Sequence, residues 1–397
     1  MSSGTPREPN ATPGESRARP TVSLRVPGER GHLFYFRKMV VKPDREIEPG
    51  SVVDILDRTG TFVGVGFYNP RSEIAIRLLS NSRDDDADFL PRRLRAAIEF
   101  RQQTLKLPDV TTAYRLCHAE GDGLTGLIVD RYGPVVVAEL FSRGWFKQLD
   151  AVKSALAALV PDATVHVVTD DLASRFEGFT LPRTAPPVPV VVTEHGAQFR
   201  INFATGHKTG FFCDQRDNRR TVASLAKGHA MLDLCCYTGG FAIHAALAGA
   251  ARVTAVDLDE KALETARQNA KLNRVKIDFL HADIFNYLKQ HKEKAELVVL
   301  DPAKLARTRE DLPNARRSYR DMNALAMRAI TPGGILVSCS CSGLVGEAEF
   351  IDILRDAARI DGRELRIFQV TGAGPDHPVS TLFPEGRYLK AVFSIVV

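Results

Sequence analysis

The sequence lacks both a membrane-length apolar run and the apolar segment of a secretory signal. A membrane-spanning helix needs about 18 consecutive apolar residues, and no run in this chain of 397 residues approaches that length. The first twenty residues, MSSGTPREPNATPGESRARP, are instead rich in Pro, Gly, Ser and Arg. We therefore expect residues 1–20 to form a disordered tail. We expect the protein to be cytoplasmic, with no membrane partner.

Cysteine is scarce, and the spacing of the six cysteines disfavours a metal or redox site. Structural zinc sites use C-x2-C pairs or His pairs at helical spacing, and redox pairs use C-x-x-C. Here Cys235 and Cys236 are adjacent, and a single residue separates Cys339 from Cys341. A disulfide within the second pair would be strained along an extended strand. We predict no metal site and free thiols. We interpret four of the six as small buried hydrophobic side chains: Cys117, Cys213, Cys235 and Cys236.

Charge is nearly balanced, so composition permits nucleic-acid binding without requiring it. The net charge is +5 and the pI about 8.8, but basic residues gather in two runs, 91–106 and 304–321. Each run is also compatible with a solvated helix face.

The N-terminal half contains two differently patterned regions. Residues 21–83 show alternating apolar residues with closely spaced turn signals, which predicts a small β-barrel. Residues 84–183 combine helices predicted at 90–106 and 146–159 with a hairpin around Arg131–Pro134, which indicates a small α+β domain. The Pro-rich segment LPRTAPPVPVVVTEHG (181–196) predicts a linker.

From about residue 196 strands and helices alternate, which indicates an α/β domain with a doubly wound parallel sheet, spanning 184–397. A helix is predicted over 259–273, and the two last apolar segments, ELRIFQV and RYLKAVFSIVV, predict a closing antiparallel pair. No internal repeat is visible. The parallel strands are predicted at 231–235, 252–257, 276–283, 296–301 and 334–340.

Four of these five strands contain or end in an acid: Asp233, Asp257, Asp283 and Asp301. A single acid at a strand end is often the N-cap of the next helix. However, ligands of this fold class bind beyond the carboxyl ends of the strands, so a series of acids favours a binding site.

The first strand leads into DLCCYTGGF, in which Cys235 and Tyr237 replace the first two glycines of a dinucleotide motif. The replacement disfavours a diphosphate at the helix N-terminus. Asp257 is placed to accept two ribose hydroxyls and Asp283 to reach an adenine amino group. The layout is typical of S-adenosyl-L-methionine binding by Asp233, Tyr237, Thr238, Gly239, Gly240, Asp257 and Asp283.

The chain resembles the bacterial large-subunit ribosomal RNA methyltransferase I family, which forms 5-methylcytosine in 23S RNA. The resemblance covers nearly the whole chain and includes GVGFYNPRSEIAIRLLS (64–80), AEGDGLTGLIVDRYG (119–133), ATGHKTGFFCDQRDNRR (204–220), CCYTGGFAIHAA (235–246), VDLDEKALETARQNAKLN (256–273), DPAKL (301–305), SCSGL (340–344) and DHPVSTLFPEGRYLK (376–390). It implies an N-terminal PUA-like barrel, a central α+β domain and a C-terminal class I (Rossmann-like) methyltransferase domain. It also implies ribosomal RNA as partner and makes a homodimer plausible.

Cys341 stands at the carboxyl end of the fifth strand, where the methyl donor is expected, and lies in the family's S-C-S-G-L motif. Carbon 5 of cytosine is a poor nucleophile, and addition of a thiolate to carbon 6 activates it. The resemblance therefore implies that Cys341, and not Cys339, is the catalytic nucleophile.

Asp301 begins DPAKL, where the family reads D-P-P-K-F. The resemblance implies that this carboxyl group hydrogen-bonds the cytosine and stabilises charge that develops on thiol addition, although a turn-forming Asp-Pro is the alternative. Ala303 and Leu305 depart from the family pattern, and we expect these changes to affect rate or target fit rather than chemistry.

The segment GHKTGFFCDQRDNR resembles a strip beside the donor, and implies cofactor contacts for Phe212, Asp214 and Gln215. Lys208 and Arg216 are candidates for the donor carboxylate or an RNA phosphate. The barrel reads GHLFYFRK where the family usually has His-Pro-Trp, so His32 is kept without Pro or Trp. We expect Lys208, together with basic residues in and after the segment DPAKL (301–305), which we call the catalytic loop, to bind unpaired RNA. The residues in and after the loop are Lys304, Arg307, Arg309, Arg316, Arg317 and Arg320.

Two alternatives remain at this point. A methyltransferase acting on another base atom, such as a guanine nitrogen, would need no thiol. A non-catalytic RNA-binding or ribosome-assembly factor would explain the changes at Ala303 and Leu305.

Overall fold

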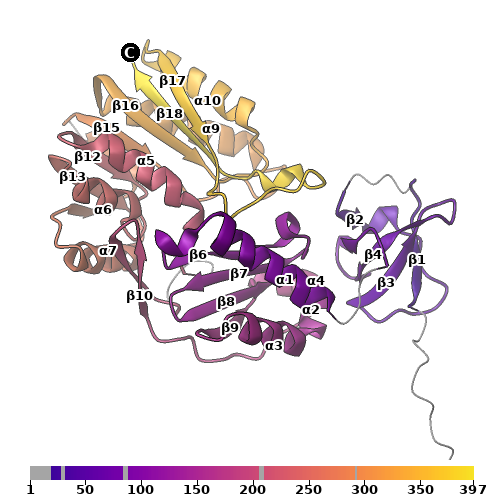
Figure 1. Cartoon of the computed structure of the whole chain (residues 1–397). Helices are drawn as coiled ribbons and strands as arrows, with labels where there is room; N and C mark the ends of the chain where they lie inside the picture. The colour runs from indigo at the N-terminus through magenta and orange to yellow at the C-terminus, as the bar shows by residue number, and fades with distance from the viewer. Residues whose placement is uncertain (1–18, 28–31, 84–87, 205–209, 291–292) are drawn as a thin grey trace, which may run out of the picture.

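A computed structural model describes residues 19–27, 32–83, 88–204, 210–290 and 293–397. These residues form three units, each built on one large sheet, and a short hairpin between the second and third (Figure 1). Among them, no helix combines the length and the hydropathy that a membrane span requires. Most of the predicted tail lies outside the described residues. Its last part is held in place, because Arg19 Nε donates to Asp54 Oδ1 at 2.9 Å.

The first unit is a curved five-stranded sheet around an apolar core, in the strand order β1-β3-β4-β5-β2. Strands β4 and β5 pack very closely. A Cβ at Gly64 would come within 2.3 Å of the Ser80 carbonyl oxygen, and one at Gly66 within 2.4 Å of the Arg77 carbonyl oxygen. Glycine is therefore required at both positions. The strands are β1 Thr21–Ser23, β2 Phe34–Phe36, β3 Ser51–Leu56, β4 Phe62–Tyr68 and β5 Ile74–Ser80.

The second unit packs helices α1 and α3 against a four-stranded sheet in the order β6-β7-β8-β9. The helix predicted over 90–106 is α1 followed by one π-helical turn, Phe100–Thr104. The single tryptophan, Trp145, lies in this core. The elements are α1 Phe89–Glu99, β6 Ala113–His118, β7 Leu127–Tyr132, β8 Val135–Leu140, α2 Arg143–Lys147, α3 Leu149–Leu159, β9 Thr164–Val168 and α4 Asp171–Glu177.

Trp145 and Glu177 join the first unit to the second. The ring of Phe67 on β4 meets the Trp145 ring edge-on at 4.8 Å. The buried carboxylate of Glu177 accepts from Asn69 Nδ2 at 2.9 Å and from Arg77 Nη2 at 3.2 Å. A buried carboxylate is stable only when such donors surround it, so these contacts fix the barrel on the α+β unit.

The third unit is a seven-stranded sheet in the order β14-β13-β12-β15-β16-β18-β17, in which β18 alone runs antiparallel to its neighbours β16 and β17. Helices α5, α6 and α7 contribute to the core on one face, and α8, α9 and α10 to the core on the other. Figure 1 shows these two layers around the sheet. The elements are α5 Arg216–Ala226, β12 Ala230–Leu234, α6 Gly240–Leu247, β13 Arg252–Asp257, α7 Glu260–Leu272, β14 Asp278–His281, α8 Ile284–Gln290, β15 Ala295–Leu300, α9 Leu312–Arg328, β16 Ile330–Ser340, α10 Glu347–Ile360, β17 Leu365–Thr371 and β18 Lys390–Val396.

The predicted linker 181–196 is only partly a linker. Its last residues form β10 (Val190–Glu194), which pairs with β11 (Ala197–Ile201) in an antiparallel hairpin. The prolines end at Pro189, and the following valines have the β-branched side chains that favour strands. The predicted ranges 21–83, 84–183 and 184–397 stay our prediction for the domain limits.

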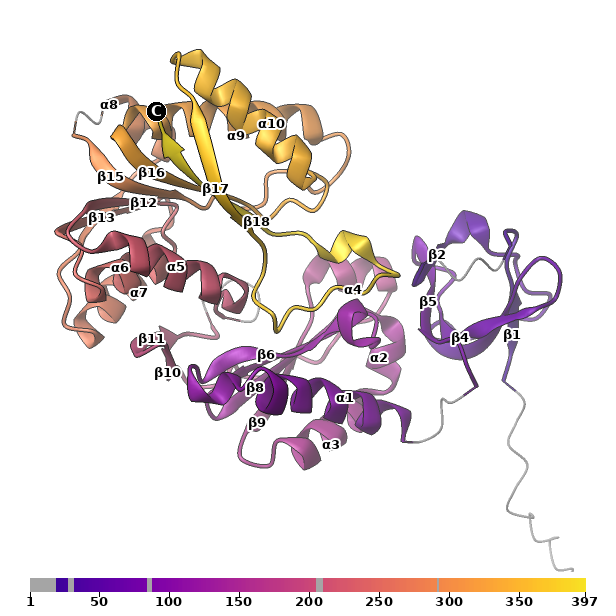
Figure 2. The same cartoon turned by 45° about the horizontal axis from the view of Figure 1, so that its top comes forward.

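The loop between β17 and β18 touches all three units. The Asp376 carboxylate accepts from Arg216 Nη2 at 3.0 Å and from the Arg115 amide at 3.0 Å, the latter in β6. Farther along, the Phe383 ring lies 4.9 Å from that of Phe34 in the barrel. Figure 2 shows this yellow loop running from the large sheet past the α+β unit toward the barrel.

Candidate active site

The turn between β12 and α6 forms the centre of the site, at the carboxyl edge of the sheet. Cys235, Tyr237 and Gly239 all adopt positive φ, at 63°, 48° and 82°. A non-glycine residue in this region costs about 1 kcal/mol or more, so the surrounding hydrogen bonds must hold the turn. The Tyr237 amide donates to Asp257 Oδ2 at 2.7 Å, and the Gly239 amide donates to the Cys236 carbonyl at 2.8 Å.

Asp233 supports this turn from beneath. Its side chain is 0% exposed, and one carboxyl oxygen accepts from the Ala242 amide of α6 at 3.0 Å. Burial raises the pKa of Asp233 to about 8, and the negative charges of Asp301 and Asp257 add to the shift. The group therefore holds a proton at neutral pH. The sequence predicted that Asp233 binds the cofactor. From this fully buried position it would act indirectly, by holding the shape of the turn.

Asp257 ends β13, as predicted, but β14 ends at His281, so Asp283 lies two residues beyond the strand and not at its last position. Besides Tyr237, Asp257 accepts from the Asp259 amide at 2.8 Å, and Asp283 accepts from the Asn286 amide at 3.0 Å in the first turn of α8. Directly after Asp257, the Leu258 side chain is 65% exposed. This exposed apolar side chain beside a strand-end acid is a candidate ligand contact that our sequence reasoning missed. The sequence feature that could have indicated it is an apolar residue, Leu258, directly after the strand, where a turn-forming residue is usual.

The strip before α5 lies against the same edge. Gln215 Nε2 donates to Asp301 Oδ2 at 3.0 Å, and Tyr388 donates its hydroxyl to Asp214 Oδ2 at 2.6 Å. The Phe212 ring meets the Tyr237 ring edge-on at 5.1 Å. Phe212 is thus brought to the turn and Gln215 to the predicted catalytic loop, whereas Asp214 contacts Tyr388 of the loop between β17 and β18.

Arg216 is buried in an ion pair, contrary to both roles suggested for it, the donor carboxylate and an RNA phosphate. It is 1% exposed and its guanidinium binds both carboxyl oxygens of Asp376, at 3.1 and 3.0 Å. Its Nε also donates to Asp217 at 3.3 Å, and at this exposure the guanidinium presents no donors to solvent. The other suggested cation, Lys208, lies outside the described residues.

Cys339 and Cys341 occupy opposite environments. Cys339 is 0% exposed in the core of the third unit, and burial raises its pKa well above the ordinary value. Cys341 is half-buried, beyond the end of β16, with its sulfur 3.9 Å from the Pro302 carbonyl oxygen of the predicted catalytic loop. Burial also raises the pKa of Cys117, Cys213, Cys235 and Cys236. The described residues contain no cluster that could hold a metal ion.

Ser342 joins the loop that carries Asp301 to the segment that carries Cys341. Its hydroxyl oxygen accepts from the Leu305 and Ala306 amides at 3.2 and 3.1 Å, and lies 3.0 Å from the Tyr319 hydroxyl of α9. These bonds fix the two loops relative to each other. The Ser-Cys-Ser-Gly pattern therefore places a structural serine beside the accessible thiol.

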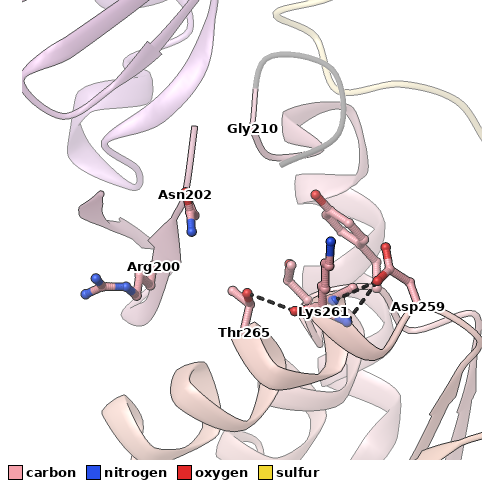
Figure 3. Close-up of a pocket in the computed structure, with 9 residues that line it drawn as sticks. Arg200, Asn202, Gly210, Asp259, Lys261 and Thr265 are labelled. Atoms are coloured by element: carbon pink, nitrogen blue, oxygen red, sulfur yellow. Dashed lines mark hydrogen bonds between the residues drawn. The ribbon is translucent and has the colours of Figure 1, made fainter. Parts of the chain in front are cut away.

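A small pocket opens beside the turn, between the β10–β11 hairpin and the N-terminal end of α7 (Figure 3). Arg200 and Asn202 form one wall, and Lys261 and Thr265 the other, with Tyr237 and Thr238 adjacent. Our sequence reasoning missed this wall because it predicted a linker where the hairpin begins. Arg200 lies in β11 of that hairpin, and Asn202 directly follows it.

The predicted RNA-binding arginines surround the catalytic loop. Arg307, Arg309, Arg316 and Arg317 are exposed, and Arg320 is half-buried. Arg316 pairs with Glu349 of α10, and Arg320 pairs with Asp321. Lys304 is exposed within the loop itself.

Comparison with known proteins identifies the family. Residues 180–378 match the family model of S-adenosylmethionine-dependent methyltransferases, and residues 28–81 match that of PUA-like domains. The Ribosomal RNA large subunit methyltransferase I of Aeromonas hydrophila is 37% identical over 91% of this chain and 95% of its own. That of Photobacterium profundum is 38% identical over 86% of this chain and 89% of its own. The chain belongs to this family.

A solved structure of a methyltransferase with SAH bound has the same fold, with a TM-score of 0.81 at 18% identity, and covers 95% of this chain and 100% of its own. The predicted α/β fold with a PUA-like N-terminal domain is confirmed. As a member of the methyltransferase I family the protein is an enzyme that uses S-adenosylmethionine. The alternative of a non-catalytic assembly factor is set aside.

The residues at the sheet edge fit this donor. Asp257 has carboxylate oxygens that could accept from ribose hydroxyls, Leu258 has an exposed apolar side chain that could contact a base, and Gly239 has no side chain and a positive φ, which would leave room for a ligand beside the turn. The donor supplies an electrophilic methyl group on a sulfonium.

Proposed function

We propose that this protein methylates carbon 5 of a cytosine in 23S ribosomal RNA through a covalent adduct with Cys341. The observation that carries the proposal is the half-buried Cys341 thiol beside the Asp301 loop, while Cys339 two positions earlier is sealed in the core. The names of the relatives support ribosomal RNA as substrate. A cytoplasmic location and a homodimer are part of the same proposal, and sedimentation velocity tests the latter.

In the proposed reaction the Cys341 sulfur bonds to carbon 6 of the cytosine, and the electron pair of the 5,6 double bond becomes available at carbon 5. Asp301 is held by Gln215 at the strand end, where its carboxyl group hydrogen-bonds the ring and stabilises the charge that develops there. Carbon 5 takes the methyl group of the donor, whose bond to the sulfonium sulfur breaks and leaves its electron pair on that sulfur. Carbon 5 then loses its proton to a base and keeps the electron pair of the broken bond. The electron pair restores the double bond and breaks the carbon–sulfur bond, which frees the thiolate.

The target cytosine must be unpaired or flipped out of a helix to reach a thiol at a sheet edge, which costs a few kcal/mol. We propose that the exposed cations around the catalytic loop bind the RNA backbone: Lys304, Arg307, Arg309, Arg316 and Arg317. We propose the same contact with the RNA backbone for Arg320 and Lys208. The PUA-like domain is proposed as a second RNA contact.

The test uses RNA that contains 5-azacytosine, which traps the adduct. Incubation with enzyme and donor is expected to give a protein–RNA adduct that survives denaturation, is lost in Cys341→Ser, and persists in the matched variant Cys339→Ser. Full methyl transfer by Cys341→Ala would contradict the proposal and select the alternative, methylation of another base atom.

A further inference from the structure

Lys390 is a buried cation on β18, the strand that pairs with β16, after which Cys341 follows. It is the first residue of β18 and lies opposite Ser340, the last residue of β16. Its side chain is only 3% exposed. Its ammonium group donates to the carbonyl oxygens of Ser342 at 2.7 Å and Tyr388 at 2.9 Å. These contacts place the charge next to the segment that carries Cys341.

The positive charge of Lys390 is not neutralised by a direct ion pair within the described part of the chain. Both acceptors are neutral carbonyl groups, and the charged groups that act on it from other elements are Glu347 and Glu349 of α10 and Lys304 of the catalytic loop. Burying an ammonium group without a counter-ion is costly. A function for the charge would explain why the chain buries a lysine here.

Cys341 is coupled electrostatically to this lysine. Burial lowers the pKa of Lys390 to about 8, and the largest opposing effect comes from Cys341, followed by the two glutamates. Such coupling is mutual, so the ammonium favours the ionised thiol as the thiolate favours the ammonium. Cys341 also acts electrostatically on Tyr319 of α9 and on Cys339. Burial raises the pKa of both, so they stay neutral near pH 7.

We propose that Lys390 is a positioning residue that keeps the sulfur of Cys341 ionised for attack and stabilises it again as it leaves the methylated base. The inference rests on the proposed role of Cys341 as nucleophile. The thiol proton goes to solvent, and Lys390 keeps its own proton throughout. The ammonium therefore stabilises the thiolate at both ends of the reaction, before the carbon–sulfur bond forms and after it breaks.

The test measures how fast iodoacetamide alkylates Cys341 as a function of pH, with the signal of Cys341→Ser subtracted. Lys390→Gln keeps hydrogen-bond donors without the charge, and Lys390→Met removes both. An opposite charge within a few ångströms lowers a thiol's midpoint by about one unit or more. In both variants we expect the midpoint to rise by about one pH unit and the rate at neutral pH to fall about tenfold.

Lys390→Arg keeps the charge and should restore the profile. Lys271→Met, at the exposed end of α7, removes a distant lysine and should leave the profile unchanged. A profile in Lys390→Gln that matches the unaltered protein would overturn the inference, because a merely structural role needs only the hydrogen bonds. If Lys390→Met does not fold, the comparison of Gln with Arg decides alone.

The 5-azacytosine adduct separates failure of this inference from failure of the proposed function. If the unaltered protein forms the adduct while the Lys390→Gln profile is unshifted, only the role of Lys390 is wrong. If the profile shifts but no adduct forms in the unaltered protein, Lys390 ionises a thiol that does not attack cytosine. When both proposals hold, adduct formation by Lys390→Gln falls about tenfold at neutral pH and recovers as pH rises.

Discussion

Two cysteines separated by one residue differ here because a strand ends between them. β16 stops at Ser340, so Cys339 is still inside the sheet and Cys341 has left it. Ser340 and Ser342 on either side bond to the Tyr319 hydroxyl, which holds the segment at the point where it leaves the strand. The chemistry of a single thiol thus depends on the hydroxyl groups next to it.

Cys339→Ala should destabilise the protein without removing the adduct. The change deletes a sulfur atom that is 0% exposed and leaves a small cavity, which costs about 1–2 kcal/mol. Urea unfolding measures the loss, and the 5-azacytosine assay measures the adduct. A folded Cys339→Ala protein that forms no adduct would contradict the assignment of Cys341 as the nucleophile.

Asp301→Asn should lower turnover and leave donor binding intact. The asparagine keeps the shape but loses the charge at the strand end, where Gln215 holds the carboxylate. By analogy with loss of one stabilising group at an active site, kcat should fall by about 10²–10³. Transfer of a labelled methyl group measures kcat, and calorimetry measures donor affinity. Asp278→Asn, at an exposed position of β14, is the control and should behave as the unaltered protein. Unchanged turnover in Asp301→Asn would remove this residue from the mechanism.

At the scale of elements, α7 holds the turn and the β10–β11 hairpin together. Asn269, fully buried on α7, donates to the Thr238 carbonyl at 3.1 Å and accepts from the Arg200 amide at 2.8 Å. One turn farther on, Asn273 makes a matching pair of bonds to Gln198 at 2.8 and 2.7 Å. The two asparagines bind the same hairpin, but only Asn269 also reaches the strained turn.

Asn269→Ala should therefore weaken both stability and donor binding. The change leaves the Thr238 carbonyl and the Arg200 amide without their hydrogen-bond partner, and each unsatisfied group costs about 1–3 kcal/mol of stability. Asn273→Ala, near the surface, is the matched control and should cost less and leave affinity for S-adenosylmethionine unchanged. Thermal unfolding and calorimetric titration with the donor measure the two effects. Equal donor affinities for the two variants would contradict this role for α7.

The sequence was informative wherever a local pattern sets the structure. The strand predicted at 252–257 is β13, and the helix predicted over 259–273 is α7, Glu260–Leu272. Both follow from apolar periodicity with an acid that ends the strand. The hairpin after Pro189 was missed because, among the residues that the structure describes, its strands pair with each other and otherwise form a single bridge, to Thr111. Its stability comes from tertiary contacts that no short window contains.

The same limit applies within the site. Strand-end acids and the accessible cysteine were predictable because parallel strands present their carboxyl ends at one edge. The pairing of Arg216 with Asp376 joins positions 160 residues apart, and the bond from Lys390 to Ser342 spans 48. Such pairs depend on the assembled sheet, so a sequence pattern cannot distinguish a buried structural arginine from a ligand-binding one.

At the scale of the whole molecule, a buried charge cluster lies between the hairpin and the methyltransferase sheet. Glu194 at the end of β10 is 0% exposed, accepts from Arg219 Nε at 2.7 Å, and lies 3.0 Å from His244 Nε2. Burial alone would raise the pKa of Glu194, but Arg219 and His244 outweigh it and lower the pKa to about 2. The hairpin is thereby tied to α5 and α6.

This cluster predicts a specific loss of stability in acid. Since the folded pKa of about 2 is below the ordinary 4.5, the ionised form stabilises the fold above pH 4.5, and this contribution disappears as pH falls toward 2. The contribution is roughly 3 kcal/mol. Urea unfolding at neutral and acid pH should show a stability gap between the unaltered protein and Glu194→Gln that narrows in acid. A gap independent of pH would rule out this contribution.

β18 follows every other strand of its sheet along the chain, yet it occupies an interior place between β16 and β17. During synthesis, the turn between β12 and α6 and the segment that carries Cys341 are made before β18, so β18 is not yet present between β16 and β17. A nascent chain interrupted between Cys341 and Lys390 would carry the acids, the turn and the thiol but lack the strand that brings Lys390 to them. On the role proposed for Lys390, the chemistry of the enzyme therefore waits until β18 has been synthesised and has paired with β16.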